Sequence, residues 1–291
     1  MCDEFTEADA ERWNSAGRMT RRGFATAGVA AAVALALPRA ANALDVVEQD
    51  VMITTPDGEA DCFFVHPAAG AHAGVLVWPD VLALRPAYRT MGRRLAEAGY
   101  SVLVANPYYR TARAPVVEPG ASFRDPAIRE LVLPHARSLT PETTATDARA
   151  FVAWLDAQDA VDTDRGIGTT GYCMGGPMVL QTAATLPERV RAGATFHGSR
   201  MVTEAEDSPH TLIPRLRGSY LLAIAENDHE RQPEAEGVLR AAFDASPATA
   251  EIEVYAGAMH GWCALDSQAH HPEQAARAHW RLLETFRQAL A

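Results

Sequence analysis

The chain of 291 residues contains no lysine, so all 26 of its basic residues are arginines. This absence excludes enzymes that bind pyridoxal phosphate through a lysine Schiff base and those that bind nucleotides through a P-loop lysine. The chain also lacks a basic stripe with interleaved aromatic residues, and its net charge of -11 is spread along its length. This charge pattern argues against nucleic-acid binding and is typical of a solvated surface.

Cysteine is also scarce, and the whole chain contains only Cys2, Cys62, Cys173 and Cys263. So few cysteines in a chain of this length do not form a disulfide framework. Cys2 lies in a segment that we predict to be removed, which leaves an odd number of thiols. We therefore expect at least one free cysteine in the mature protein.

The apolar stretch over residues 25–37 is too short to cross roughly 30 Å of hydrocarbon as a helix. It follows the pair Arg21 and Arg22, and it precedes Ala41-Asn42-Ala43, which offers a small-x-small cleavage site. A charged region, an apolar region and a cleavage site in this order resemble a twin-arginine export signal.

These features predict a signal peptide over residues 1–43 and a mature protein that begins near Leu44. The twin-arginine route would place the protein in the periplasm, with no stable membrane span after cleavage. An uncleaved membrane anchor or a chance pair of arginines is the alternative. Because this route exports proteins that are already folded, a free catalytic cysteine could survive it.

Residues 44–291 are expected to form a single domain, because 48% of the chain is hydrophobic and 22% is charged. Short apolar runs such as "GVLVW" and "SVLVA" alternate with helical patterns of ten or more residues. The first two strands are expected to form a hairpin around Pro56-Asp57-Gly58. This alternation predicts an α/β fold with a mostly parallel central sheet and helices on both faces.

The regular pattern lapses over residues 110–141, where prolines and arginines are frequent. A loop this long inside a compact domain is usually functional or disordered. It leaves the carboxyl end of a strand, where open α/β sheets bind ligands. We therefore predict that this segment forms a lid or a cleft wall, with an idle surface excursion as the alternative.

The stretch "TTGYCMGGPM", residues 169–178, places Cys173 in a Gly-x-Cys-x-Gly run where hydrolases ordinarily have serine. A sharp turn from a strand into a helix needs small neighbours, and Gly171 and Gly175 supply that space. The turn would aim the N–H of Met174 at a reacting carbonyl and set a thiolate near a helix N-terminus. Cys173 is thus a candidate nucleophile, and a small buried hydrophobic residue is the alternative.

A thiol nucleophile needs a base, and the base needs an orienting acid, in the chain order nucleophile, acid, histidine. Asp228 ends a predicted strand in "LLAIAENDHE", and His260 lies in the loop after the next strand, in "VYAGAMHGWC". The order is therefore satisfied. Asp228 could instead cap a turn, with Glu226 as the substitute acid, and His260 could be a structural loop histidine.

The run "GIGTTG", residues 166–171, matches the Gly-x-Gly-x-x-Gly fingerprint of dinucleotide-binding proteins. That fingerprint needs a complete strand before its first glycine, but the residues before Gly166 are a polar helix end and a loop. No acidic residue closes a second strand about 20 residues further on. We therefore reject a dinucleotide-binding function.

The motifs "GYCMGG", "ENDHE" and "GAMHGW" together resemble those of the dienelactone hydrolase family of the α/β-hydrolase superfamily, over roughly residue 45 to the C-terminus. The resemblance implies that Cys173, Asp228 and His260 form a catalytic triad. It also implies hydrolysis of a small-molecule ester or lactone, of the carboxymethylenebutenolidase type, through an acyl-enzyme and without a cofactor or metal. The adjacent His270 and His271 do not share a helix face, which also argues against a metal site.

The resemblance extends to the loop after the strand "GVLVW". It implies that the backbone N–H of Val81 is the second oxyanion donor, beside that of Met174. It also implies that Asp80 takes the place of a glutamate that holds the resting thiol until substrate arrives, with a carboxylate one methylene shorter. Asp80 could instead be an ordinary residue at a strand end.

Family members that cleave lactones grip the substrate carboxylate with two arginines. Arg110 matches the first, with an ordinary surface arginine as the alternative, whereas Ala264 stands at the second position. Since alanine carries no charge, we expect neutral esters or lactones to compete well with carboxylated ones. We expect Tyr108, Tyr109 and Trp262 to flank the substrate pocket.

A second class of function is a non-catalytic binding protein or a thiol redox sensor on the same fold, because a fold does not fix a function. The order of the three triad residues favours the enzyme. The sequence favours a monomer without determining the oligomeric state.

Overall fold

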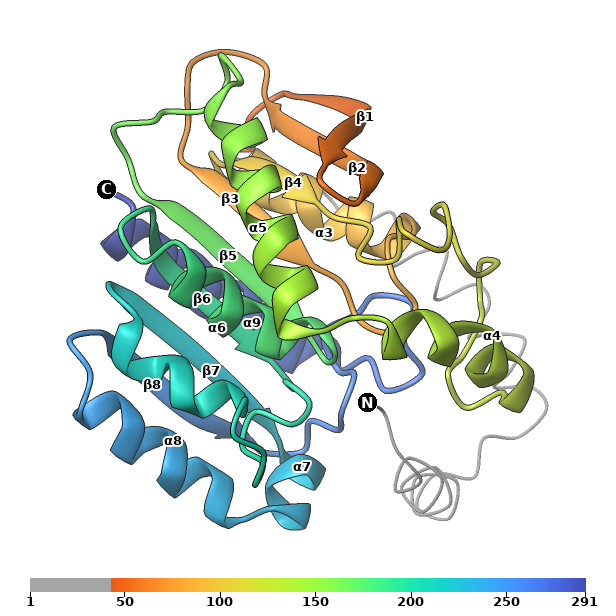
Figure 1. The fold of residues 1–291 in the computed structure, drawn as a ribbon, viewed down its shortest axis with the longest axis vertical. Coiled ribbons are helices and arrows are strands. Elements are labelled where there is room, and N and C mark those ends of the chain that lie inside the picture. The colour runs from red at the N-terminus through yellow and green to blue at the C-terminus, as the bar shows by residue number, and fades with distance from the viewer. Residues whose placement is uncertain (1–42) are drawn as a thin grey trace.

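The computed structural model describes residues 43–291, so the predicted signal peptide lies outside the described residues except for Ala43. In this part of the chain, eight strands form one sheet in the order β1-β2-β4-β3-β5-β6-β7-β8 (Figure 1). The strands are β1 (Val46–Thr55), β2 (Gly58–Pro67), β3 (Gly74–Trp78), β4 (Ser101–Val104), β5 (Ile167–Tyr172), β6 (Val190–Phe196), β7 (Ser219–Ala225) and β8 (Thr249–Tyr255). The first two strands form the predicted antiparallel hairpin, and β2 also pairs antiparallel with β4. The remaining neighbours are parallel, which confirms the predicted mostly parallel sheet.

Helices cover both faces of this sheet, as Figure 1 shows. The helices are α3 (Pro86–Glu97), α4 (Pro126–Arg137), α5 (Pro141–Asp156), α6 (Gly175–Thr185), α7 (Glu226–Arg231), α8 (Glu234–Asp244) and α9 (Pro272–Ala289), with a 3-10 helix η1 (Pro209–Arg215). One apolar core lies between the sheet and α5, α6 and α8, and a second lies between the sheet and α3 and α9. Within the described residues, no helix combines the length and apolar character that crossing a bilayer requires.

Gly168, one of the glycines of the rejected nucleotide motif, has a packing role in β5. Gly168 lies within the strand, and a Cβ atom there would come within 3.1 Å of Phe286 and 3.0 Å of Leu290. This strand therefore carries glycine where α9 and the C-terminal residues pack against the sheet.

The segment over residues 110–141 is more regular than the sequence predicts, because it contains α4. Asp125 caps this helix by accepting a hydrogen bond from the N–H of Ala127. Pro134 lies inside the helix, and an internal proline is a strong signal against a helix in a sequence. The segment packs Val117 and Val132 against the loop after β3, so it is part of the folded domain.

A buried ionic cluster fastens the start of this segment to α5 and to the hairpin. Both guanidinium nitrogens Nη1 and Nη2 of Arg110 donate to the fully buried Asp147, at 2.9 and 2.7 Å, and Nη2 also donates to Asp57. The hydroxyl of Tyr109 donates to Asp147 at 2.7 Å. Burial raises the pKa of Asp147, while the donors Arg110 and Tyr109 oppose that rise. These donors compensate the buried carboxylate for its lost hydration.

We expect Arg110→Ala to destabilise the protein by about 3 kcal/mol, the lower end for breaking a buried ion pair, because Tyr109 still donates to Asp147. The measurement is the free energy of unfolding in urea. Arg113→Ala is the matched control, because Arg113 is 59% exposed in its pair with Asp61. That variant should lose less than about 1 kcal/mol. Equal losses in the two variants would contradict the role of Arg110.

Candidate active site

Cys173 occupies the sharp turn between β5 and α6, with a positive φ of 53°. Few residues other than glycine adopt this left-handed conformation, and it is typical of a nucleophile held above the edge of a sheet. A Cβ atom on Gly171 would overlap the carbonyl of Gly175, and one on Gly175 would overlap the carbonyl of Trp78. The two glycines that flank Cys173 are therefore required for backbone contacts.

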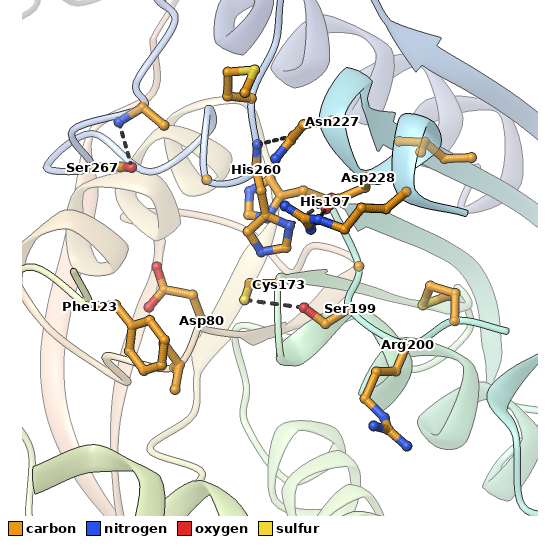
Figure 2. A pocket seen from close by; sticks show the side chains of 18 of the residues that line it. Asp80, Phe123, Cys173, His197, Ser199, Arg200, Asn227, Asp228, His260 and Ser267 are labelled. Carbon is orange, nitrogen blue, oxygen red and sulfur yellow. Dashed lines mark hydrogen bonds and ion pairs between the residues drawn. The ribbon is translucent and has the colours of Figure 1, made fainter. Parts of the chain in front are cut away.

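Asp228 and His260 reach the same edge of the sheet from two other strands. Asp228 lies in α7, directly after β7, and His260 lies in the loop after β8. The Nδ1 atom of His260 donates to Oδ2 of Asp228 at 2.6 Å, and the backbone N–H of His260 donates to Asn227 at 2.8 Å. Figure 2 shows the imidazole of His260 pointing towards Cys173. The structure therefore gathers the three residues at one edge of the sheet, with Asp228 hydrogen-bonded to His260 and with Cys173 and His260 in the wall of one cavity.

The substitute acid proposed for Asp228 has a different place. The carboxylate of Glu226 accepts a hydrogen bond from the backbone N–H of Gly257 at 3.2 Å, and Asp228 is the residue bound to His260. Glu226 therefore supports the loop that carries His260.

The charges around His260 favour its protonated form. Burial by itself lowers the pKa of an imidazole, but the negative charges of Asp228 and of an ionised Cys173 outweigh burial and raise the pKa of His260 well above its usual value. A cation therefore sits between two groups that become anions. A protonated His260 would in turn stabilise negative charge on a nearby thiol.

Two residues that the sequence reasoning missed lie beside the thiol. His197 follows β6, and its ring centroid lies 4.8 Å from that of His260. The hydroxyl of Ser199 lies 3.5 Å from the sulfur of Cys173 (Figure 2). The signal that could have found them is position, because "FHGS" follows a strand at the same edge of the sheet as the triad.

Asp80 has a different partner from the thiol that the resemblance implied. Its oxygens Oδ1 and Oδ2 accept hydrogen bonds from Nη1 and Nη2 of Arg85, at 2.7 and 2.9 Å. Arg85 also donates to both oxygens of Asp266, at 2.8 and 2.9 Å. In Figure 2 the carboxylate of Asp80 points away from Cys173. The shorter aspartate therefore closes an ion pair with an arginine that the sequence reasoning did not single out.

The two predicted oxyanion donors lie on neighbouring segments that one tyrosine joins. Val81 follows Asp80 in the loop after β3, and Met174 is the first residue after Cys173. The hydroxyl of Tyr108 lies 3.0 Å from the carbonyl oxygen of Val81 and 3.2 Å from the sulfur of Met174, so its one proton is shared between these two acceptors. Tyr108 therefore holds the two backbone segments beside each other.

A cavity of about 480 Å³ opens above Cys173 and His260. Its size is that of a site for a small organic molecule. One wall is formed by residues 120–124 of the segment predicted to be a lid or cleft wall. Apolar side chains contribute to its surface from several elements: Leu82, Phe123, Met201, Val202, Ile224 and Leu239.

The structure places the four predicted substrate-binding residues differently from the prediction, because none of them lines this cavity. Arg110 and Tyr109 bind the buried Asp147, and Tyr108 is buried behind the loop after β3. Trp262 is fully buried and stacks on Tyr255 with 5.3 Å between ring centroids. The three aromatic side chains turn into the core, where they bury more apolar surface than they would in the cavity wall.

Two other arginines supply positive charge to the cavity. Arg124 and Arg200 both line it, and neither forms an ion pair within residues 43–291. Arg124 donates to the side chain of Gln268 at 3.3 Å. Ala264, at the second position of the arginine clamp, is fully buried. Positive charge therefore enters this cavity from positions other than those the resemblance implied.

The same residues 43–291 contain no group of three or more histidine, cysteine, aspartate or glutamate side chains arranged to hold a metal ion. Within these residues Cys62, Cys173 and Cys263 form no disulfide bond.

A sharp turn after one parallel strand, followed in chain order by an acid and a histidine after two later parallel strands, defines the fold class of the α/β hydrolases. The model of the dienelactone hydrolase family matches residues 61–290, so the chain belongs to this family. A carboxymethylenebutenolidase of Rhodococcus opacus is 28% identical over 239 residues, which cover 78% of this chain and 86% of the relative. A carboxymethylenebutenolidase of Pseudomonas sp. is 27% identical over 223 residues, which cover 76% of this chain and 87% of the relative.

Solved structures agree on the fold. A putative dienelactone hydrolase from Klebsiella pneumoniae superposes with a TM-score of 0.72 at 20% identity, and the match covers 84% of this chain and 99% of that chain. A dienelactone hydrolase from Anabaena variabilis superposes with a TM-score of 0.59 at 19% identity, with the same coverage. At these identities the likeness supports the fold alone.

We expect Gly175→Ala to lower kcat/KM for an ester by about 100-fold, the effect of losing one oxyanion donor. The added methyl group would push α6 away from the end of β3 and so separate Met174 from Val81. The control is Gly237→Ala in α8, where a Cβ atom meets nothing within 4 Å. That variant should keep its activity and gain about 0.5 to 1 kcal/mol of stability. Full activity in folded Gly175→Ala would show that this contact does not position the donors.

Proposed function

We propose that this protein is a cysteine-dependent hydrolase of carboxylic esters or lactones that acts through an acyl-enzyme. The observation that carries the proposal is the meeting of Cys173, His260 and Asp228 at the floor of one cavity. The alternative of a binding protein or redox sensor needs only the thiol, and it gives no reason for a histidine oriented by a carboxylate beside it.

The reaction begins when His260 holds the proton of Cys173 and the thiolate attacks the carbonyl carbon of the substrate. A carbon–sulfur bond forms, and the carbonyl electrons move to oxygen. When this tetrahedral intermediate collapses, the bond to the leaving oxygen breaks and His260 gives that oxygen its proton. In a lactone the leaving oxygen stays attached to the acyl group.

Hydrolysis of the thioester completes the cycle. His260 takes a proton from water, and the water oxygen attacks the thioester carbon. The carbon–sulfur bond then breaks, which releases the acid and returns the thiolate. Asp228 keeps His260 in the orientation and tautomer that both steps need.

The negative oxygen of each tetrahedral intermediate would accept hydrogen bonds from the N–H groups of Val81 and Met174. Met174 stands at the N-terminus of α6, where the helix dipole favours negative charge. The Tyr108 bridge supports this role, because donors act most strongly when they are held in place before the reaction.

The cavity supports a substrate larger than a bare lactone ring, with an apolar part beside Phe123 and Leu239. Since Arg110 is bound to Asp147 and Ala264 carries no charge, a substrate carboxylate would not meet the expected pair of arginines. Arg124 or Arg200 would have to bind it. Neutral esters are therefore expected to be substrates as well.

We expect Cys173→Ala to lose about 1000-fold or more in kcat, as when a catalytic nucleophile is removed, and iodoacetamide to abolish native turnover. The assay uses a carboxylated lactone and its neutral methyl ester. The matched control is Cys62→Ala, because burial raises the pKa of the Cys62 thiol to about 12 and keeps it protonated. Unchanged turnover in Cys173→Ala would favour the binding or redox-sensing function.

We also propose that the protein is exported to the periplasm by its twin-arginine signal. Replacing both Arg21 and Arg22 by lysine should leave the precursor in the cytoplasm, whereas Arg39→Lys, outside the pair, should not. Cell fractionation and N-terminal sequencing measure location and cleavage, with a mature terminus expected at or near Leu44. Export of the double variant would indicate another route, and an intact N-terminus on exported protein would indicate an anchor.

A further inference from the structure

Two segments of the chain bring polar side chains to the cavity around the sulfur of Cys173. His260 faces it from the loop after β8, and the hydroxyl of Ser199 lies 3.5 Å away. His197 lies in the same turn after β6 as Ser199 and lines the same cavity. We propose that His197 is a further catalytic residue, a neutral second imidazole whose N–H holds Cys173 as a thiolate in the free enzyme. This inference rests on the proposed function, because it concerns the same nucleophile.

The backbone fixes the direction of the His197 side chain. Its φ of 42° is left-handed, a conformation that residues with a side chain rarely adopt. Its N–H donates to the carbonyl of Ala223 in β7 at 2.8 Å, and the N–H of Ser199 donates to the carbonyl of Cys173 at 3.0 Å. The turn after β6 is therefore tied to both neighbouring strands. Unfavourable backbone angles held by such bonds are typical of functional positions.

The ring of His197 is enclosed by the catalytic residues and by aromatic side chains. It is 1% exposed, and its centroid lies 4.8 Å from that of His260 and 5.0 Å from that of Trp262. Neither ring nitrogen has a protein hydrogen-bond partner of ordinary geometry within the described residues. A buried imidazole left in this state calls for a functional explanation, and a thiolate at Cys173 would supply an acceptor.

The groups around His197 give the two histidines different charges. The ionisable groups that face it are Cys173, His260, Asp228 from α7 and Tyr172 from β5. Burial lowers the pKa of His197 and outweighs the contact with Cys173, which raises it, and the positive charge of His260 lowers it further. The negative charges of Asp228 and Cys173 instead raise the pKa of His260, which favours its protonated form. His197 is therefore a neutral donor, and His260 is the cation.

The placement of Asp80 allows Cys173 to be a thiolate whether or not substrate is bound. A carboxylate turned towards the sulfur would repel a thiolate, but both oxygens of Asp80 already accept from Arg85. With that charge balanced, the surroundings of Cys173 are dominated by donors. The nucleophile would then be ionised before substrate binds, without the switch that the family resemblance implied.

The test is the ionisation of Cys173 in the full-length protein without substrate, as a function of pH. It is followed by absorbance at 240 nm relative to Cys173→Ala, and by the rate of iodoacetamide labelling located by mass spectrometry. An unperturbed thiol has a pKa of about 8.5. We expect Cys173 to titrate at least about one unit lower, as thiols beside a positive charge do.

Four variants separate the donor from the ring volume of His197. His197→Phe and His197→Met remove the N–H, and each should raise the apparent pKa of Cys173 by about one unit, which slows labelling at pH 6 about 10-fold. His197→Gln keeps a donor and should stay within about threefold of the native rate. His66→Phe, which removes a histidine on β2 far from the cavity, should match the native protein. Two donor-free variants are included so that a folding failure in one leaves the other to decide.

A folded His197→Phe or His197→Met variant with the native titration curve would overturn the proposal. So would a native protein whose Cys173 ionises only after a substrate analogue is added. In both cases ester hydrolysis that is lost in Cys173→Ala would still support the proposed function. Retained hydrolysis in Cys173→Ala would instead count against the proposed function itself.

Discussion

The active site depends on the backbone contact between the first turn of α6 and the end of β3. Gly175 lies so close to the carbonyl of Trp78 that no side chain fits between them. This contact brings the turn that carries Cys173 beside the loop that carries Val81. A nucleophile on one strand and a hydrogen-bond donor on another can act on one carbonyl only if the two backbones approach in this way.

Fixed charge pairs hold the loops around that contact, and all of them use arginine as the cation. Arg85 joins the loop after β3 to Asp266 in the loop that follows His260. Arg110 joins the start of the cavity-wall segment to α5 through Asp147. Each guanidinium binds two carboxylates, and it binds at least one of them with two nitrogens, which the single ammonium of a lysine cannot reproduce. The absence of lysine is thus consistent with a protein that positions its loops through bidentate contacts.

Much of the fold and of the site could be predicted because the signals are local in sequence. The alternation of apolar runs and helical patterns is enough to predict a parallel sheet, and the glycines around Cys173 indicate a sharp turn from a strand into a helix. The order of Asp228 and His260 after Cys173 follows from the order of the strands. The helix α4 was missed because Pro134 opposes a helix locally, and contacts of Val132 with the loop after β3 compensate for it. Trp262 and Tyr108 were placed in the pocket wall because a sequence does not tell which side of a loop faces the core.

The sequence by itself determined which chemistry is available: a thiol at a strained turn, followed in order by an acid and a histidine. Only the tertiary structure decided what surrounds the thiol. Asp80 binds Arg85, which also binds Asp266, 181 residues further along the chain, and His197, in the turn after β6, lies beside His260 although the sequence around it carries no catalytic motif. The physical reason is that charge and hydrogen-bond partners act over a few ångströms in space, and folding sets those distances between residues whose spacing in the chain carries no signal.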